Sequence, residues 1–199
     1  MMNRLAVSAR PVFPVNTPPS LGCRDPLALA SFRPSRRAIA RPTKGNASAM
    51  RLSVVITTYN HPEWLAKVLW GFEAQRFRDF EVLVADDGSD ERTRALLDGL
   101  RTQVTFPMRH VWQEKQGFRK CTILNEAIAR AEGEYLFFTD GDCIPRRDLL
   151  AVHAGLARRG RFLSGGYLKL PMETSQAITR DDIMAGRATE YAWLRAHGT

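Results

Sequence analysis

Cysteine is scarce in this sequence. The 199 residues include three cysteines, Cys23, Cys121 and Cys143, which form no Cys-x-x-Cys pair and have no histidine at ligand spacing. Structural zinc sites depend on such paired ligands. We therefore expect no zinc site, and we interpret Cys143 as a small buried residue and not as a nucleophile.

Long apolar runs are also missing. No stretch of the sequence approaches the roughly 18–20 apolar residues that cross a bilayer. Hydrophobic residues nevertheless make up 44% of the chain, which is enough for the core of one domain of ordinary size. We expect a cytoplasmic protein with a single folded domain.

Acidic residues are nearly absent from the amino-terminal quarter. Residues 1–49 contain one acid, Asp25, against eight basic side chains, so this segment carries +7 of the formal net charge of +8. The remaining residues are almost neutral and show no basic stripe. The sequence therefore predicts no nucleic-acid-binding surface.

The same segment is rich in proline. It holds seven of the eleven prolines and no helical or strand periodicity, so we expect residues 1–49 to be a disordered tail. Its composition resembles that of a transit peptide, but it lacks an amphipathic helix and the apolar core of a secretory signal. Because Met50 directly precedes the first expected strand, we interpret the tail as an extension from a misplaced start codon or as a segment without catalytic importance.

Strands and helices alternate through residues 50–199. Strands are expected at about 52–58, 80–85, 104–112, 135–139 and 162–170, and helices at about 62–72, 92–100, 119–131 and 148–158. β-Branched runs predict the strands, and apolar residues at helical spacing predict the helices. Strands separated by helices of this length imply βαβ units, so we expect an α/β fold with a mostly parallel sheet.

Polar clusters follow three of the expected strands. They read Thr-Thr-Tyr-Asn at 57–60, Asp-Asp-Gly-Ser at 86–89 and Asp-Gly-Asp at 140–142. Each cluster alone could be an ordinary turn or helix cap. The carboxyl ends of parallel strands lie at one edge of a sheet, so the three clusters are expected to converge on one crevice. Asp140 and Asp142 offer the hard oxygen ligands that suit Mg²⁺ or Mn²⁺ on phosphates.

Two classes of phosphate- or nucleotide-binding enzyme fit the sequence poorly. Phosphatases of the haloacid dehalogenase type also carry Asp-x-Asp after a strand, but they place it on the first strand and need a lysine and further acids well downstream. Dinucleotide-binding oxidoreductases require Gly-x-Gly-x-x-Gly after the first strand, and this sequence has none there.

The segments 52–60, 80–89 and 137–142 together resemble the family-2-type glycosyltransferases with the GT-A fold. Motif order and spacing agree as well as motif identity, over about residues 51–170. The resemblance implies a Rossmann-like three-layer fold. It also implies an enzyme that moves a sugar from a nucleotide diphosphate donor, with UDP favoured, to an acceptor hydroxyl with inversion. The acceptor could be a saccharide of an envelope polysaccharide, a lipid-linked sugar or a protein; a lipid-borne acceptor would bring the protein to the inner membrane face.

The resemblance also assigns donor-binding residues. It places Thr57, Tyr59 and either Asp86 or Asp87 at the base and ribose, and the sequence does not decide between the two acids. It gives Arg119 a contact to the base or the diphosphate, because a planar guanidinium suits such oxygens. The alternative for Arg119 is a solvated residue in the first turn of a helix.

The acidic turn matches the family's Asp-x-Asp motif. In that reading Asp142 ligates Mn²⁺ or Mg²⁺, and Asp140 contacts the ribose, the metal or its water shell. The cation is needed because negative charge grows on the diphosphate leaving group as the glycosidic bond breaks. Asn125 stands at a recurrent family position, where it either helps the donor site or serves as a structural cap or hydrogen-bond bridge.

A general base for the acceptor hydroxyl is not recognisable. Family members supply it from a later segment that has no counterpart here, which leaves Asp181 and Asp182, in a polar stretch expected to be helical, as the candidates. The resemblance thus implies a donor-binding part without the C-terminal acceptor region. Two hypotheses stay open: a transferase that is active alone or with a partner, and a non-catalytic donor-binding remnant.

Overall fold

The computed structural model describes residues 6–8 and 51–199, all within one compact unit of the chain. Residues Ala6–Ser8 form the short strand β1. The rest of the expected disordered tail over residues 1–49 lies outside the described residues.

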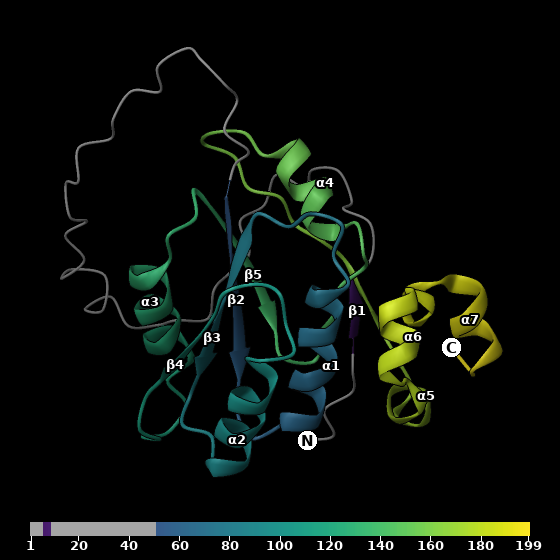
Figure 1. Cartoon of the computed structure of the whole chain (residues 1–199), viewed down its shortest axis with the longest axis horizontal. Coiled ribbons are helices and arrows are strands. Elements are labelled where there is room, and N and C mark those ends of the chain that lie inside the picture. The colour runs from purple at the N-terminus through teal and green to yellow at the C-terminus, as the bar shows by residue number, and fades with distance from the viewer. Residues whose placement is uncertain (1–5, 9–50) are drawn as a thin grey trace. The chain divides into compact units, whose positions relative to one another are not determined.

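Four parallel strands form the main sheet, in the order β4-β3-β2-β5 (Figure 1). The strands are β2 (Leu52–Thr58), β3 (Phe80–Asp86), β4 (Met108–Trp112) and β5 (Tyr135–Asp140). The predicted α/β class with a mostly parallel sheet is confirmed. β4 begins later than the predicted residue 104, because Pro107 has no N–H to donate to the sheet.

Helices cover both faces of this sheet and make three layers (Figure 1). On one face, α1 (Pro62–Glu73) and α2 (Glu91–Leu100) enclose the larger core with apolar side chains of β2 and β3. On the other face, α3 (Lys120–Arg130) buries Ile123 and Ala127 against Val55 and Leu83. Alternate side chains of the strands therefore pack into two cores, one on each face of the sheet. This explains why the strand sequences are almost continuously hydrophobic.

The remaining elements are short. They are β6 (Cys143–Ile144), α4 (Leu149–Leu156), β7 (Tyr167–Lys169), α5 (Met172–Ala177), α6 (Arg180–Ala185), the 3₁₀ helix η1 (Arg187–Thr189) and α7 (Tyr191–Ala196). β1 lies between β6, to which it is parallel, and β7, to which it is antiparallel. A third core beside α1 joins Ile144, Leu170, Ile183 and Leu194 to Trp64. The predicted strand near 162–170 is present only as residues 167–169.

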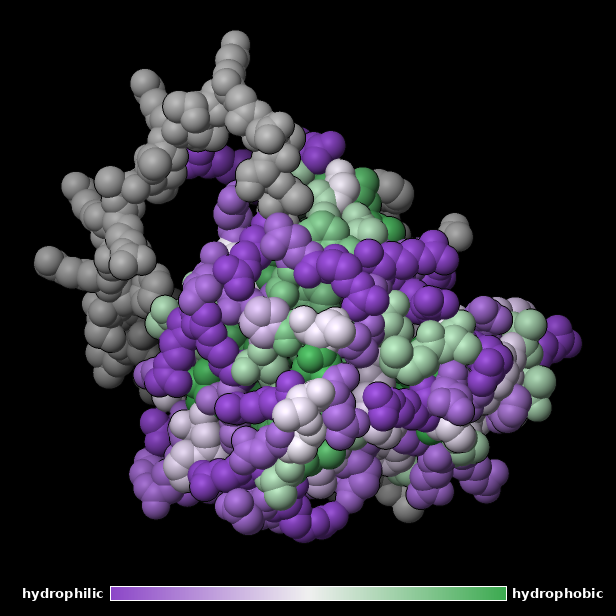
Figure 2. Space-filling model, viewed as in Figure 1, coloured by the Kyte–Doolittle hydropathy of each residue, from purple (hydrophilic) through white to green (hydrophobic). Residues whose placement is uncertain are grey.

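Hydrophilic side chains dominate the surface seen in Figure 2, with hydrophobic residues in smaller areas between them. Within the described residues, no helix combines the length and the apolar character that a membrane span requires.

Candidate active site

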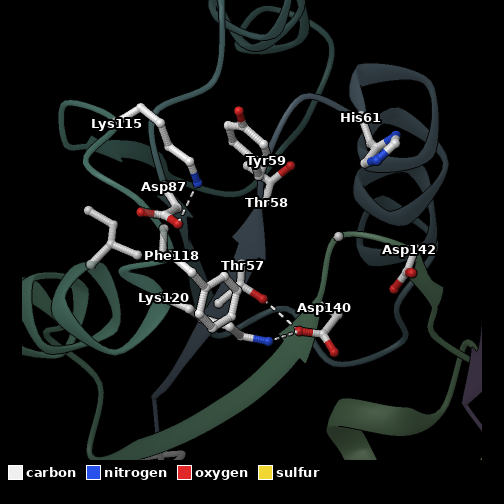
Figure 3. Close-up of a pocket in the computed structure, with 13 residues that line it drawn as sticks. Thr57, Thr58, Tyr59, His61, Asp87, Lys115, Phe118, Lys120, Asp140 and Asp142 are labelled. Atoms are coloured by element: carbon white, nitrogen blue, oxygen red, sulfur yellow. Dashed lines mark hydrogen bonds and ion pairs between the residues drawn. The ribbon is translucent and has the colours of Figure 1, made fainter. Parts of the chain in front are cut away.

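The three polar clusters meet at the carboxyl edge of the sheet. In the strand register, Thr57 of β2 lies opposite Asp140 of β5 and Ala85 of β3. A pocket of about 360 Å³ opens there, and members of all three clusters line it, among them Tyr59, Asp87 and Asp142 (Figure 3). The expected convergence on one crevice is confirmed, because parallel strands place their carboxyl ends together.

Asp140 is held in place by two donors at one of its oxygens. The hydroxyl of Thr57 donates to Oδ1 at 2.6 Å, and the ammonium of Lys120 donates to the same atom at 2.5 Å (Figure 3). Burial by itself would raise the pKa of Asp140, but these hydrogen bonds and the charge of Lys120 lower it below its usual value. Asp140 is therefore a fixed carboxylate whose Oδ2 has no protein donor among the described residues.

The pKa of Asp142 is raised, in contrast to that of Asp140. Burial raises its pKa, and repulsion from Asp140 raises it further. Its nearest polar partner is Cys143, whose thiol donates to Oδ1 at 3.6 Å. The charge of Lys120 opposes this shift, but Asp142 forms no ion pair in the described part of the chain, so a cation beside it would stabilise its charged form.

The donor set of this turn fits Mg²⁺ or Mn²⁺ bound together with phosphate. Such ions are commonly held by one or two carboxylates, with substrate phosphates and water completing the shell. Asp140 and Asp142 provide those carboxylates. Among the described residues, no group of three or more His, Cys, Asp or Glu side chains could hold a metal ion. A metal at this turn would therefore need phosphate or water as further ligands.

Gly141 and Cys143 complete the turn. The N–H of Gly141 donates to the Thr57 carbonyl at 2.7 Å, and a Cβ at this position would lie 2.9 Å from the same oxygen. Glycine thus lets the acidic turn pack directly on β2. The Cys143 thiol is half-buried, and burial together with the charges of Asp142 and Asp140 raises its pKa to about 12. A thiol with this pKa is protonated at neutral pH, and the protonated form is a weak nucleophile.

Asp86 does not reach the pocket. It is fully buried (0% exposed), its Oδ1 accepts from the Ser89 N–H at 2.8 Å, and its Oδ2 lies 2.8 Å from Nε2 of His110. Of the two acids that the resemblance offered for the donor, Asp86 is thus the one that does not line the pocket. Its role is to hold the turn after β3 and to link β3 to β4.

Asp87 is the acid of this pair that faces the pocket (Figure 3). Its Oδ1 accepts from Gln113 at 2.5 Å, and its Oδ2 accepts from Lys115 at 2.9 Å and from the N–H of Arg119 at 3.1 Å. Burial would raise the pKa of Asp87, but these three hydrogen bonds and the charge of Lys115 lower it. Asp87 is thus an ionised acceptor in a fixed orientation.

Aromatic side chains form the rim. The ring of Tyr59 is 43% exposed, and the ammonium of Lys115 lies 3.7 Å from its centroid. Phe118 lines the same pocket and is 83% exposed. Flat, accessible rings of this kind are suited to stacking on a planar base or on the apolar face of a sugar.

Besides Asp86, four sequence candidates lie outside the residues that line the pocket. The guanidinium of Arg119 donates to Gln116 at 2.7 Å, so this residue contributes only its backbone N–H to Asp87. Asn125 is exposed on α3. Asp182 completes a capping box with Thr179 at the start of α6, and Asp181 is exposed on the same helix. The structure does not bring Asp181 or Asp182 to the pocket, so neither is supported as a base.

Two lysines of the pocket were missed by sequence reasoning. Lys115 and Lys120 are the cationic partners of Asp87 and Asp140. Helical spacing could have found Lys120, because it stands three and seven residues before Ile123 and Ala127, the buried face of α3. Lys115 lies in a loop, where no periodicity marks its direction.

The chain belongs to the family described as Glycosyl transferase family 2, which matches residues 53–189. The mostly parallel sheet with helices on both faces is a GT-A fold. A mannosyltransferase of Pyrobaculum calidifontis, solved in complex with GDP-Man and Mn²⁺, is similar at 25% identity with a TM-score of 0.51. That similarity covers 57% of this chain and 34% of the mannosyltransferase.

Curated relatives are similar over about half of this chain. The glycosyltransferase YfnE of Bacillus subtilis is 35% identical over 106 residues, which are 52% of this chain and 26% of YfnE. The validoxylamine A glucosyltransferase of Streptomyces hygroscopicus subsp. jinggangensis is 35% identical over 112 residues, 53% of this chain and 26% of that enzyme. The chain therefore spans about a quarter of the length of these relatives.

Proposed function

We propose that the pocket binds the nucleotide diphosphate sugar donor of a metal-dependent, inverting glycosyltransferase. The observation that carries this proposal is the convergence of three carboxylates, those of Asp87, Asp140 and Asp142, on one cavity at the carboxyl edge of a parallel sheet. Membership of glycosyltransferase family 2 supports the reaction class. The GDP-Man and Mn²⁺ bound by the similar mannosyltransferase support the ligand and the cation.

Tyr59 and Asp87 bind the base in this proposal. Oδ2 of Asp87 already accepts two hydrogen bonds, whereas Oδ1 accepts one and keeps a free lone pair for the imide N–H of uracil. The base stacks on Tyr59, which requires Lys115 to leave the face of the ring.

The acidic turn binds the ribose and the diphosphate. Asp140, fixed at Oδ1 by Thr57 and Lys120, presents Oδ2 to a ribose hydroxyl or the water shell of the metal. Asp142 would hold Mn²⁺ or Mg²⁺, which supplies Lewis-acid stabilisation of the leaving diphosphate. Lys120 adds a fixed positive charge at the same edge, where it stabilises the charge that develops.

Thermal stabilisation of the full chain tests the donor site. UDP, UDP-sugars and GDP-mannose are added with and without Mn²⁺ to the wild type, to Asp142→Asn and to Asp181→Asn, which carries the same charge change outside the pocket. At a ligand concentration of 100 times Kd, binding adds about 2.7 kcal/mol, or roughly 5–10 °C in Tm. We expect this metal-dependent shift in the wild type and Asp181→Asn and its loss in Asp142→Asn. No shift with any nucleotide would overturn the assignment.

One observation favours a second function, donor binding without transfer. Inversion needs a base that takes the proton of the acceptor hydroxyl. The carboxylates that line the pocket in the described part of the chain are those of Asp87, Asp140 and Asp142, and all three serve the donor in this proposal. Release of free nucleotide from bound UDP-sugar with saccharide acceptors separates the two functions: turnover shows a transferase, and binding without turnover shows a donor-binding protein.

A further inference from the structure

A second pocket, also of about 360 Å³, lies beyond the carboxyl end of α1. Its lining includes Arg76, Arg146, Arg147, Asp148 and Tyr191; we call it the arginine pocket. The pocket of the acidic turn, which we call the donor pocket after its proposed ligand, lies at the amino end of α1, where His61 lines it. A helix of 12 residues spans about 18 Å, so the two pockets are separate sites.

Hydrogen bonds bring these arginines together from distant parts of the sequence. The N–H of Arg76 donates to the carbonyl of Arg147 at 2.9 Å. The buried side chain of Gln75 donates to the carbonyl of Arg146 at 2.6 Å and accepts from the N–H of Leu150 at 3.0 Å. The end of α1 and the loop before α4 are thereby joined, and the position of each arginine backbone is fixed.

Arg147 is further held between two helix ends. Its Nη1 donates to the carbonyl of Ala185 at 3.3 Å, and its Nε donates to that of Ala74 at 3.5 Å. Gly186, with φ of +87°, leaves room for its stem, because a Cβ there would lie 2.7 Å from Arg147 Cδ. Among the described residues, Nη2 of Arg147 has no partner and can donate into the pocket.

The charge of the arginine pocket is only partly balanced. Asp148 forms a two-point ion pair with Arg146, with both distances at 3.1 Å. The hydrogen bonds and charge of Arg146 lower the pKa of Asp148, and the charge of Arg76 adds a smaller lowering. Glu190 is the other carboxylate of the lining. The guanidinium of Arg76 makes no hydrogen bond or ion pair within the described residues, so the lining keeps a net positive charge and unused N–H donors.

We propose that the arginine pocket binds a phosphate group, carried either by an anionic lipid headgroup or by a small phosphorylated molecule. Guanidinium groups match phosphate oxygens in geometry and remain charged at all physiological pH values. The Tyr191 hydroxyl, on a side chain that is 74% exposed, adds a neutral donor at the rim. This site is independent of the proposed donor function.

Arg76→Gln tests the proposal on the full chain. The residue is exposed and unpaired in the described structure, so its replacement leaves folding intact, and Arg159→Gln removes the same charge from an exposed position outside the pocket. The first probe is inorganic phosphate, titrated at constant ionic strength in EDTA and followed by thermal shift. The second is co-sedimentation with vesicles of phosphatidylcholine, with and without phosphatidylglycerol.

We expect the wild type and Arg159→Gln to respond equally and Arg76→Gln to bind at least one probe about tenfold more weakly, the loss of one charge-assisted contact. A loss confined to phosphate identifies a small phosphorylated ligand, and a loss on phosphatidylglycerol vesicles identifies a lipid headgroup. Equal losses in both variants, or no binding of either probe, would overturn the site. Stabilisation of Arg76→Gln by UDP with Mn²⁺ reports on the donor pocket separately.

Discussion

The two pockets at the ends of α1 have similar volumes and opposite charge arrangements. In the donor pocket, Asp87 and Asp140 line the cavity and each has a lysine partner that fixes one of its oxygens. In the arginine pocket the cations line the cavity, and Asp148 pairs with one of them. The first arrangement presents oriented acceptors to a ligand, and the second presents donors.

The difference between the pockets lies in how their charges are positioned. The acids of the donor pocket follow parallel strands, so the sheet itself sets their spacing. The arginines lie on loops that depend on Gln75 and on helix-end carbonyls for their positions. Substitutions at strand ends should therefore affect either stability or binding, whereas substitutions of the residues that support the arginine loops, such as Gln75, should affect both.

The largest effect is expected within the acid pair after β3. Asp86→Ala leaves the buried Ser89 N–H and His110 without their acceptor and should lower the free energy of unfolding by about 3 kcal/mol. Asp87→Ala should cost less, about 1 kcal/mol, because its partners Gln113 and Lys115 are half-exposed and can bind water instead, but it should abolish UDP binding. Urea denaturation and UDP titration check both. Equal stability losses in the two variants would contradict the separation of roles.

Gln75 should be the main support of the arginine pocket. Gln75→Ala removes three hydrogen bonds of a buried side chain and should lower the free energy of unfolding by about 2 kcal/mol. It should also weaken phosphate binding, because the loop of Arg146 loses its anchor. Gln176→Ala, at an exposed position, is the matched control and should change neither quantity.

Lys120 and the adjacent Arg119 should differ in donor binding. Lys120→Met removes the cation that fixes Asp140 and should weaken metal-dependent UDP binding by about tenfold, with little change in stability. Arg119→Met, whose side chain contacts Gln116 outside the pocket, should bind UDP like the wild type. Isothermal titration with Mn²⁺ measures both. A stronger effect at Arg119 would restore the sequence-based assignment.

The smallest effect is a pH dependence at α4, the helix after the loop of Arg146 and Arg147. His153 is 3% exposed, and burial lowers its pKa. In the unfolded chain His153 therefore binds a proton near pH 6.5, whereas in the folded chain it binds the proton only at lower pH. The free energy of unfolding should fall below pH 6.5 by up to about 1.4 kcal/mol per pH unit. Urea denaturation from pH 8 to 5 should show this fall in the wild type and His61→Gln but not in His153→Gln.

Most of the sheet and its pocket could be predicted from the sequence. β-Branched runs located β2, β3 and β5, and parallel topology then required the acids after β3 and β5 to meet. The choice between Asp86 and Asp87 was left open, although alternation contained the answer. Asp86 lies on the same face of β3 as Val82 and Val84, which pack in the core with α1. The side chain of Asp86 is therefore expected to be buried.

The C-terminal third could be predicted less well. α5, α6 and α7 have six residues each, which is too short for a helical spacing of apolar residues to be recognised in the sequence. Their positions follow from tertiary contacts such as the packing of Leu194 near Trp64 of α1. The arginine pocket was missed for the same reason, because tertiary hydrogen bonds of Gln75 and of the Arg76 N–H bring Arg76 and Arg146 together.

The central position of β2 sets an order of assembly during synthesis. β3 follows β2 closely in the chain, but Asp140 is 83 residues beyond Thr57, its hydrogen-bond partner. At a translation rate of about 5–20 residues per second, β2 leaves the ribosome roughly 4 to 17 seconds before β5 can pair with it. The acidic turn is thus synthesised well after β2 and β3, so a ligand that needs Asp140 and Asp142 could not assist the early stages of folding.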